Sequence, residues 1–154
     1  MDPFSTESEL FALQSHFHQG QYAETIDYDI STLSPENHLA AKVLVLRARI
    51  ALGQAKEVFG EVKGAAEPEL QAVAALAACE GGKVEEAAAL VEELAASDGE
   101  NGTVQVLGGI VLYRAGKAEE ALALLGKHEG NRRSYPHISL KALYGRNPGG
   151  IIQN

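Results

Sequence analysis

The residues most able to do chemistry are a few histidines, one cysteine and several pairs of adjacent glutamates. His16 and His18 lie two positions apart, which on a helix places them on different faces and gives poor geometry for one metal ion. Cys79 has no histidine or basic cluster beside it in the sequence, so a buried, unreactive thiol is expected. Adjacent glutamates such as Glu85 and Glu86 also point apart, which predicts a solvated helix face rather than an acid–base pair.

Sequence motifs for catalysis or cofactor binding are likewise missing. The chain has no HExxH, no paired CxxC and no GxSxG. Gly81 and Gly82 precede Lys83, but Val84 then stands where a phosphate-binding loop needs serine or threonine. The sequence therefore predicts a protein that is not an enzyme and that binds no cofactor and no metal.

The length, charge and composition of the chain narrow the class of protein further. With 154 residues the chain is long enough for one domain and its own core. The formal net charge of -8 argues against a nucleic-acid binder, and a single cysteine excludes an internal disulfide. We find no basic and apolar leader at the first residues and no apolar stretch long enough to cross a bilayer, so a soluble intracellular protein is expected.

A short glycine motif recurs four times and sets the expected fold. A glycine followed by Gln or Lys, an apolar or aromatic residue, any residue and Glu occurs every 29 to 34 residues, close to the tetratricopeptide period. These structural turn glycines are Gly20, Gly53, Gly82 and Gly116. Each follows an amphipathic stretch, so we expect it to end a helix with positive φ, and the nearby Glu to favour the start of the next helix.

The motif divides the chain into helix pairs. Ser34 before Pro35 predicts an N-cap at the start of the second repeat. The expected helices are 7–19 and 22–30, 35–52 and 55–62, 68–80 and 84–96, and 102–115 and 118–127. The predicted fold is all-α, a tetratricopeptide-like right-handed solenoid of about four stacked antiparallel helical hairpins.

The last segment does not fit the repeat. Its basic residues outnumber its acidic ones, unlike the rest of the chain, and Pro136 and Pro148 are helix breakers. We therefore expect a helical solenoid over residues 1–130 and a divergent, disordered tail over 131–154.

Several stretches resemble the coatomer epsilon family over about residues 1–131. They are Phe17-His18-Gln19-Gly20-Gln21-Tyr22, Leu46-Arg47-Ala48-Arg49-Ile50-Ala51-Leu52-Gly53-Gln54, Pro68-Glu69-Leu70-Gln71-Ala72-Val73 and Glu119-Glu120-Ala121-Leu122-Ala123-Leu124-Leu125. The run from Pro68 to Val73 is the most specific of these, because any such repeat has the Gly-x-Tyr turn. Family members continue with further helical repeats, whereas this chain departs from the pattern at Arg132.

The resemblance implies a non-enzymatic subunit of the coatomer (COPI) vesicle coat. Such a subunit grips the C-terminal region of the alpha subunit of coatomer and stabilises the complex. It acts in retrograde Golgi-to-ER and intra-Golgi transport, cytoplasmic and peripheral on Golgi membrane through the coat. The alternative is a generic helical-repeat adaptor or chaperone cofactor that binds a short peptide.

The partner-binding residues are expected on the first helix of each pair, because those helices line the concave side of tetratricopeptide-like arrays. Long or aromatic polar residues on such helices are the candidates, namely Arg47, Arg49, Tyr113 and Arg114. A clamp for a peptide carboxylate would need several such cations to converge, and the sequence offers few.

Overall fold

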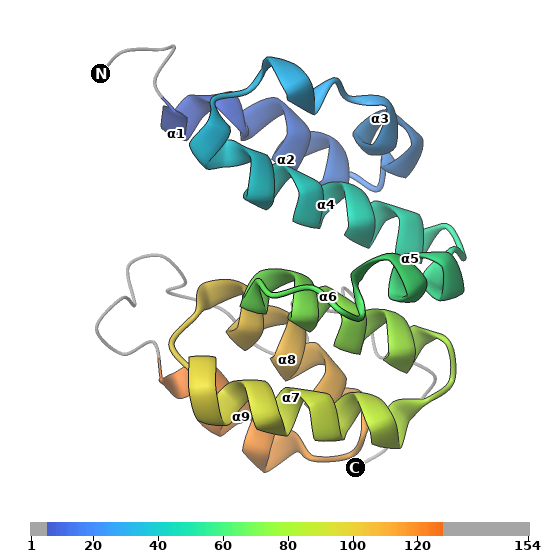
Figure 1. Ribbon diagram of the computed structural model, residues 1–154, viewed down its shortest axis with the longest axis vertical. Coiled ribbons are helices and arrows are strands. Elements are labelled where there is room, and N and C mark those ends of the chain that lie inside the picture. Colours follow the sequence, from blue (N-terminus) through green and yellow to red (C-terminus); the bar gives the residue numbers. More distant parts are fainter. Residues whose placement is uncertain (1–5, 128–154) are drawn as a thin grey trace. The chain divides into compact units, whose positions relative to one another are not determined.

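The computed structural model describes residues 6–127, and these are helical with no strand among them (Figure 1). The chain divides into two compact units, residues 1–61 and 62–154. The expected boundary at residue 130 and the expected tail over 131–154 lie outside the described residues.

The first unit packs short helices around one longer helix. In chain order they are α1 (Thr6–Glu9), α2 (Phe11–His18), α3 (Tyr22–Asp27), two 3-10 turns η1 (Ile30–Thr32) and η2 (Pro35–Asn37), α4 (His38–Ala51) and α5 (Ala55–Val62). Helices α2, α3 and α4 contact one another, and both 3-10 turns rest against α4. The buried centre of the unit holds Leu13, Leu33, Ala41 and Leu44, with Leu10, Phe17, Tyr28 and Ile30 packed around them.

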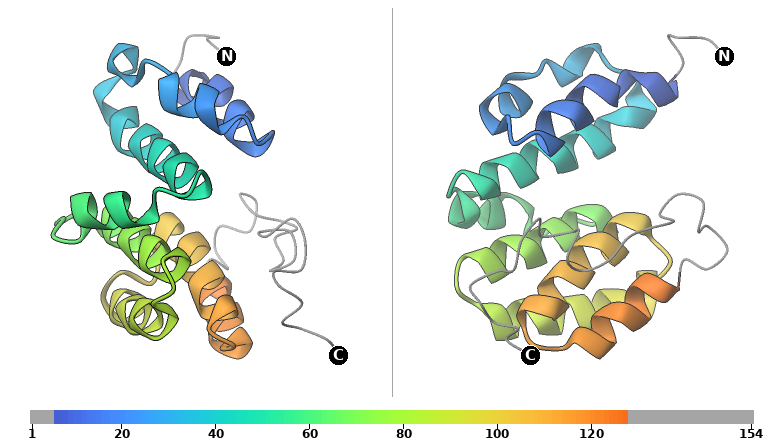
Figure 2. Two further views of the ribbon diagram at one scale, coloured as in Figure 1. Left: turned by 90° about the vertical axis from the view of Figure 1, so that its right-hand side faces the viewer. Right: turned by 180° about the vertical axis from the view of Figure 1, so that it is seen from behind.

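The second unit contains two helical hairpins. They are α6 (Pro68–Glu80) with α7 (Val84–Asp98), and α8 (Gly102–Arg114) with α9 (Ala118–Gly126). Within this unit α8 packs against α6, α7 and α9, so it is buried on most sides (Figure 2). The repeated hairpins confirm the predicted all-α, helical-repeat class.

The four motif glycines form the turns between paired helices. Their φ angles are +78° at Gly20, +95° at Gly53, +96° at Gly82 and +83° at Gly116, and no non-glycine residue described has positive φ. After each glycine, the next backbone N–H donates to the carbonyl five residues earlier, as Lys117 does to Leu112 at 2.8 Å. This is the Schellman arrangement, which satisfies the open carbonyls of a helix end. The predicted positive φ is confirmed at all four glycines.

Helix bounds agree closely from α5 onward and differ most near the start of the chain. Helices 55–62 and 68–80 match the prediction, and α7 runs two residues longer than predicted. The predicted helix 22–30 ends at Asp27, because the Asp29 carboxylate accepts from the backbone N–H and the hydroxyl of Ser31 and starts a separate 3-10 turn. A side chain that bonds its own backbone two residues on competes with the helix.

Ser34 is an N-cap residue followed by proline, as predicted, but it occupies the N-cap of the 3-10 turn η2 and not of the α-helix. Its hydroxyl donates to the Glu9 carboxylate at 2.7 Å and its backbone N–H donates to the same carboxylate at 2.8 Å. Ser34 makes no side-chain capping bond, and Pro35 opens a 3-10 turn before the α-helix begins at His38. The segment that was expected to cap a helix therefore ties the start of α4 back to α1.

Candidate protein-binding site

Helix α4 carries two of the candidate residues and is basic throughout. It holds Lys42, Arg47 and Arg49 but no Asp or Glu, and the adjacent helix α2 has no acidic residue either. The chain as a whole has a formal net charge of -8. Helix α4 is therefore a basic segment of an acidic protein, with its Arg49 paired to Glu61 of α5 and with Glu24 and Asp27 on the neighbouring α3.

Arg47 stacks on an aromatic ring. Its guanidinium carbon lies 4.6 Å from the centroid of the Phe17 ring. That ring in turn meets the rings of His18 at 5.5 Å and Tyr22 at 5.6 Å, both edge-on. Arg47 is partly buried, and loss of water around the guanidinium lowers its pKa to about 10, against a weaker opposing effect of Tyr22. A guanidinium over an aromatic face is a cation–π contact.

Arg49 braces the turn after its own helix. Two of its nitrogens donate to the Glu61 carboxylate at 3.0 and 2.8 Å, and its Nε donates to the Gln54 side chain at 3.0 Å. The hydrogen bonds raise the pKa of Arg49 and lower that of Glu61. Because Glu61 belongs to α5, this bidentate pair holds α4 and α5 together at the Gly53 turn.

Tyr113 and Arg114 end helix α8, and both are partly buried. Arg114 forms an ion pair with Glu80 at the end of α6, which joins neighbouring hairpins of the second unit. Cys79, beside Glu80, is buried as predicted, and burial raises the pKa of its thiol despite the opposing effect of Arg114. A raised pKa disfavours the reactive thiolate.

The four candidates are thus split between the units. Arg47 and Arg49 lie on α4 of the first unit, and Tyr113 and Arg114 lie on α8 of the second. Each of the three arginines has an interaction partner within its own unit. Their role toward another protein stays a prediction.

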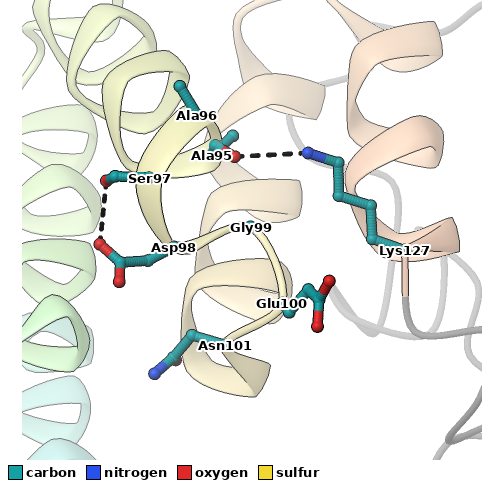
Figure 3. Close-up of a pocket in the computed structure, with 8 residues that line it drawn as sticks. All are labelled: Ala95, Ala96, Ser97, Asp98, Gly99, Glu100, Asn101 and Lys127. Carbon is teal, nitrogen blue, oxygen red and sulfur yellow. Dashed lines mark hydrogen bonds between the residues drawn. The ribbon is translucent and has the colours of Figure 1, made fainter.

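An open hollow of about 610 Å³ lies at the turn between α7 and α8 (Figure 3). Its wall is formed by residues 95–101 and by Lys127, whose ammonium donates to the Ala95 carbonyl at 3.3 Å. Asp98 and Glu100 supply the carboxylates, and the Asp98 group accepts from the Ser97 hydroxyl. These groups form no nucleophile–base pair. We therefore assign no chemistry to the hollow.

A buried amide that contacts the wall of the hollow, Gln105, was not predicted from the sequence. Gln105 is fully buried in α8, and its Nε2 donates to the Gly99 carbonyl at 2.8 Å. Its Oε1 has no partner among the described residues. The sequence signal for this buried amide was Gln105 itself, a polar residue inside the apolar run of α8. The bond to Gly99 fixes the α7–α8 turn.

Within residues 6–127 the structure contains no group of three or more His, Cys, Asp or Glu residues that could hold a metal ion. In the same range no helix is long and apolar enough to cross a bilayer. His16 instead hydrogen-bonds the Gln21 side chain at 2.7 Å.

Comparison with known proteins gives one consistent result. A family model described as the coatomer epsilon subunit matches residues 6–132. Coatomer subunit epsilon-2 of Arabidopsis thaliana is 36% identical over 118 residues, which are 73% of this chain and 40% of that protein. The probable coatomer subunit epsilon of Schizosaccharomyces pombe is 27% identical over 127 residues, 82% of this chain and 41% of that protein. No solved structure matches significantly.

Proposed function

The chain belongs to the coatomer epsilon subunit family, and we propose that it is a non-enzymatic structural subunit of the coatomer (COPI) coat. The observation that carries this proposal is the family match across residues 6–132, which spans nearly all the described helices. The chain spans about two fifths of the length of the relatives it matches. The function and partners of a whole coatomer subunit are therefore proposals for this chain.

The proposed partner is the alpha subunit of coatomer, through its C-terminal region. Binding would stabilise that subunit and place the chain, with the coat, on the cytoplasmic side of Golgi membrane and vesicles in retrograde and intra-Golgi transport. Membrane association is then indirect, through the complex. Stacked helical hairpins suit this role because they present an extended surface to another polypeptide.

The residues proposed to face the partner are Arg47 and Arg49 on α4 and Tyr113 and Arg114 on α8. All four are partly accessible, and Arg49, Tyr113 and Arg114 lie in the last turns of their helices, so a partner can reach them without unfolding the helix. Arginine and tyrosine are also enriched among the residues that dominate protein interfaces.

A clamp for the carboxylate of a short peptide is the weaker alternative. Such a clamp needs free, convergent cations, but Arg49 is bonded to Glu61 and Arg114 to Glu80. The geometry therefore favours the coat subunit over a chaperone cofactor.

Affinity purification of the tagged full chain with mass spectrometry separates these functions. We expect coatomer subunits, the alpha subunit above all, to be enriched. A second measurement uses light scattering to detect direct binding of the chain to the C-terminal region of the alpha subunit. Enrichment of chaperones with no coatomer subunit would overturn the proposal.

A further inference from the structure

Arg47 differs from the other two candidate arginines in having no carboxylate partner in the part of the chain that the structure describes. No described carboxylate lies within ion-pair distance of Arg47, and no described residue accepts a hydrogen bond from it. Arg49 and Arg114 each have such a carboxylate. A guanidinium has five N–H donors, so Arg47 keeps an unused set of them.

This arrangement is costly for a folded chain on its own. A cation that loses water without gaining a counter-ion destabilises the fold. The lowered pKa of Arg47, about 10, reflects the same loss of water. The contact with the Phe17 face offsets part of the cost but offers no hydrogen-bond acceptor to the edge of the guanidinium.

The surroundings of Arg47 also favour an acidic ligand. Helices α2 and α4 pack together and contain no Asp or Glu; the neighbouring helix α3 carries Glu24 and Asp27, and neither forms an ion pair with Arg47. Arg47 stacks on the Phe17 ring, which in turn meets the rings of His18 and Tyr22. An arginine on an aromatic platform is the composition typical of residues that anchor an interface, and local charge of one sign selects a partner of the other.

We infer that Arg47, held over Phe17, is the anchor for an Asp or Glu side chain of an acidic segment in the partner protein. The guanidinium edge binds that carboxylate through two parallel N–H···O bonds, while Phe17 fixes the plane of the guanidinium. This inference rests on the proposed function, because it names the partner chemistry of the same α4 surface.

The first test measures binding of the full chain to the C-terminal region of the alpha subunit. Arg47→Met keeps the apolar stem and removes the charge, so we expect roughly tenfold weaker binding or more. Its melting midpoint is expected to equal or exceed that of the parent, because an unbalanced cation is gone. Lys42→Met removes an exposed charge from the same helix and is the control, expected to bind within about twofold of the parent. Unchanged binding by Arg47→Met overturns the inference.

Charge neutralisation in the partner identifies the ligand. Each Asp and Glu of the alpha region is changed to Asn or Gln and measured against both the parent and Arg47→Met. We expect at least one change that weakens binding to the parent but not to the variant, which is the signature of a direct pair. If only amidation of the C-terminal carboxylate shows this coupling, the side-chain ligand is wrong.

A second test does not depend on the coat partner. The Nε–H resonance of Arg47, assigned by its loss in Arg47→Lys, is followed by nitrogen-15 NMR during titration with N-acetyl-glutamate amide. We expect a saturable shift with this probe and none with N-acetyl-glutamine amide. No shift with either probe overturns the inference even if the chain binds the alpha region. A shift in a chain that does not bind that region supports the inference while the proposed function fails.

Discussion

In the first unit the Glu9 carboxylate gathers three hydrogen bonds from Ser34 and Asn37, residues 25 and 28 positions away in the chain. In the second unit the helices are held together by close packing of their axes. A methyl group added to Gly108 of α8 would lie 2.8 Å from a Leu124 methyl of α9 and 2.9 Å from a Val91 methyl of α7. The second unit also has ion pairs between its helices, such as that of Arg114 with Glu80, but close packing of small residues sets it apart from the first.

The difference follows from the sequence of each helix. In α6 every residue from Ala72 to Cys79 is buried, five of the eight being alanine, and small side chains let helix axes approach closely. Interiors packed this tightly lose stability when even one carbon is added. The first unit has a six-residue helix, α3, and two 3-10 turns, whose ends need side-chain partners. It follows that the second unit should be sensitive to added volume and the first to loss of single polar groups.

The largest expected effect is that of Gly108→Val. The branched side chain would overlap Val91 and Leu124, so we expect a loss of about 3 kcal/mol in the free energy of unfolding. Gly126→Val places the same side chain in open space and should stay within about 0.5 kcal/mol of the parent. Denaturant unfolding of both variants checks this. Equal stability of the two would mean that the close packing around α8 is not what holds the second unit.

The next effect separates backbone conformation from packing. Gly116 and Gly60 both have open space around an added carbon, but Gly116 alone of the two has positive φ, +83°. We expect Gly116→Ala to lower the free energy of unfolding by about 1 kcal/mol and Gly60→Ala, inside helix α5, to raise it by about 0.5–1 kcal/mol. Thermal melts measure both. A stabilising Gly116→Ala would contradict the role given to the turn glycines.

Local features of this fold were predictable from sequence, and long-range ones were not. The glycine motif predicted the turns because positive φ is a local demand that glycine meets at little cost. The bond between Glu9 and Ser34 and the stacking of Arg47 on Phe17 join segments far apart in the chain, where helical periodicity carries no information. For the candidate site, residue type and helix selected Arg47 as a candidate, and its role toward a partner stays a prediction. The folded structure was needed to show that Arg47, unlike Arg49 and Arg114, has no carboxylate partner among the described residues.

The third prediction tests the polar contacts of the first unit through pH. Hydrogen bonds from Ser34, and then from Asn37, hold the pKa of Glu9 below its ordinary value of 4.5. A carboxylate with a lowered folded pKa stabilises the fold above that ordinary value, and the contribution is lost as pH falls through the folded pKa. Glu9→Gln should therefore melt slightly lower than the parent at neutral pH and lose less stability on acidification. Glu24→Gln, at an exposed position of α3, is the matched control for the change of charge. Identical acid profiles for Glu9→Gln and the parent would exclude this role.

The smallest expected effect is that of the bidentate pair between Arg49 and Glu61. Glu61 is 52% exposed, so water and salt weaken the attraction, and we expect a coupling energy of about 0.2–1 kcal/mol from Arg49→Met, Glu61→Gln and the double variant. The value should shrink as NaCl rises from low concentration to about 1 M, because exposed charges are screened over a few ångströms at that ionic strength. A coupling that did not change with salt would mean that the Arg49 side chain braces α5 by packing rather than by charge. The first unit would then resemble the second, and the contrast between the two units would rest on Glu9 and Arg47 alone.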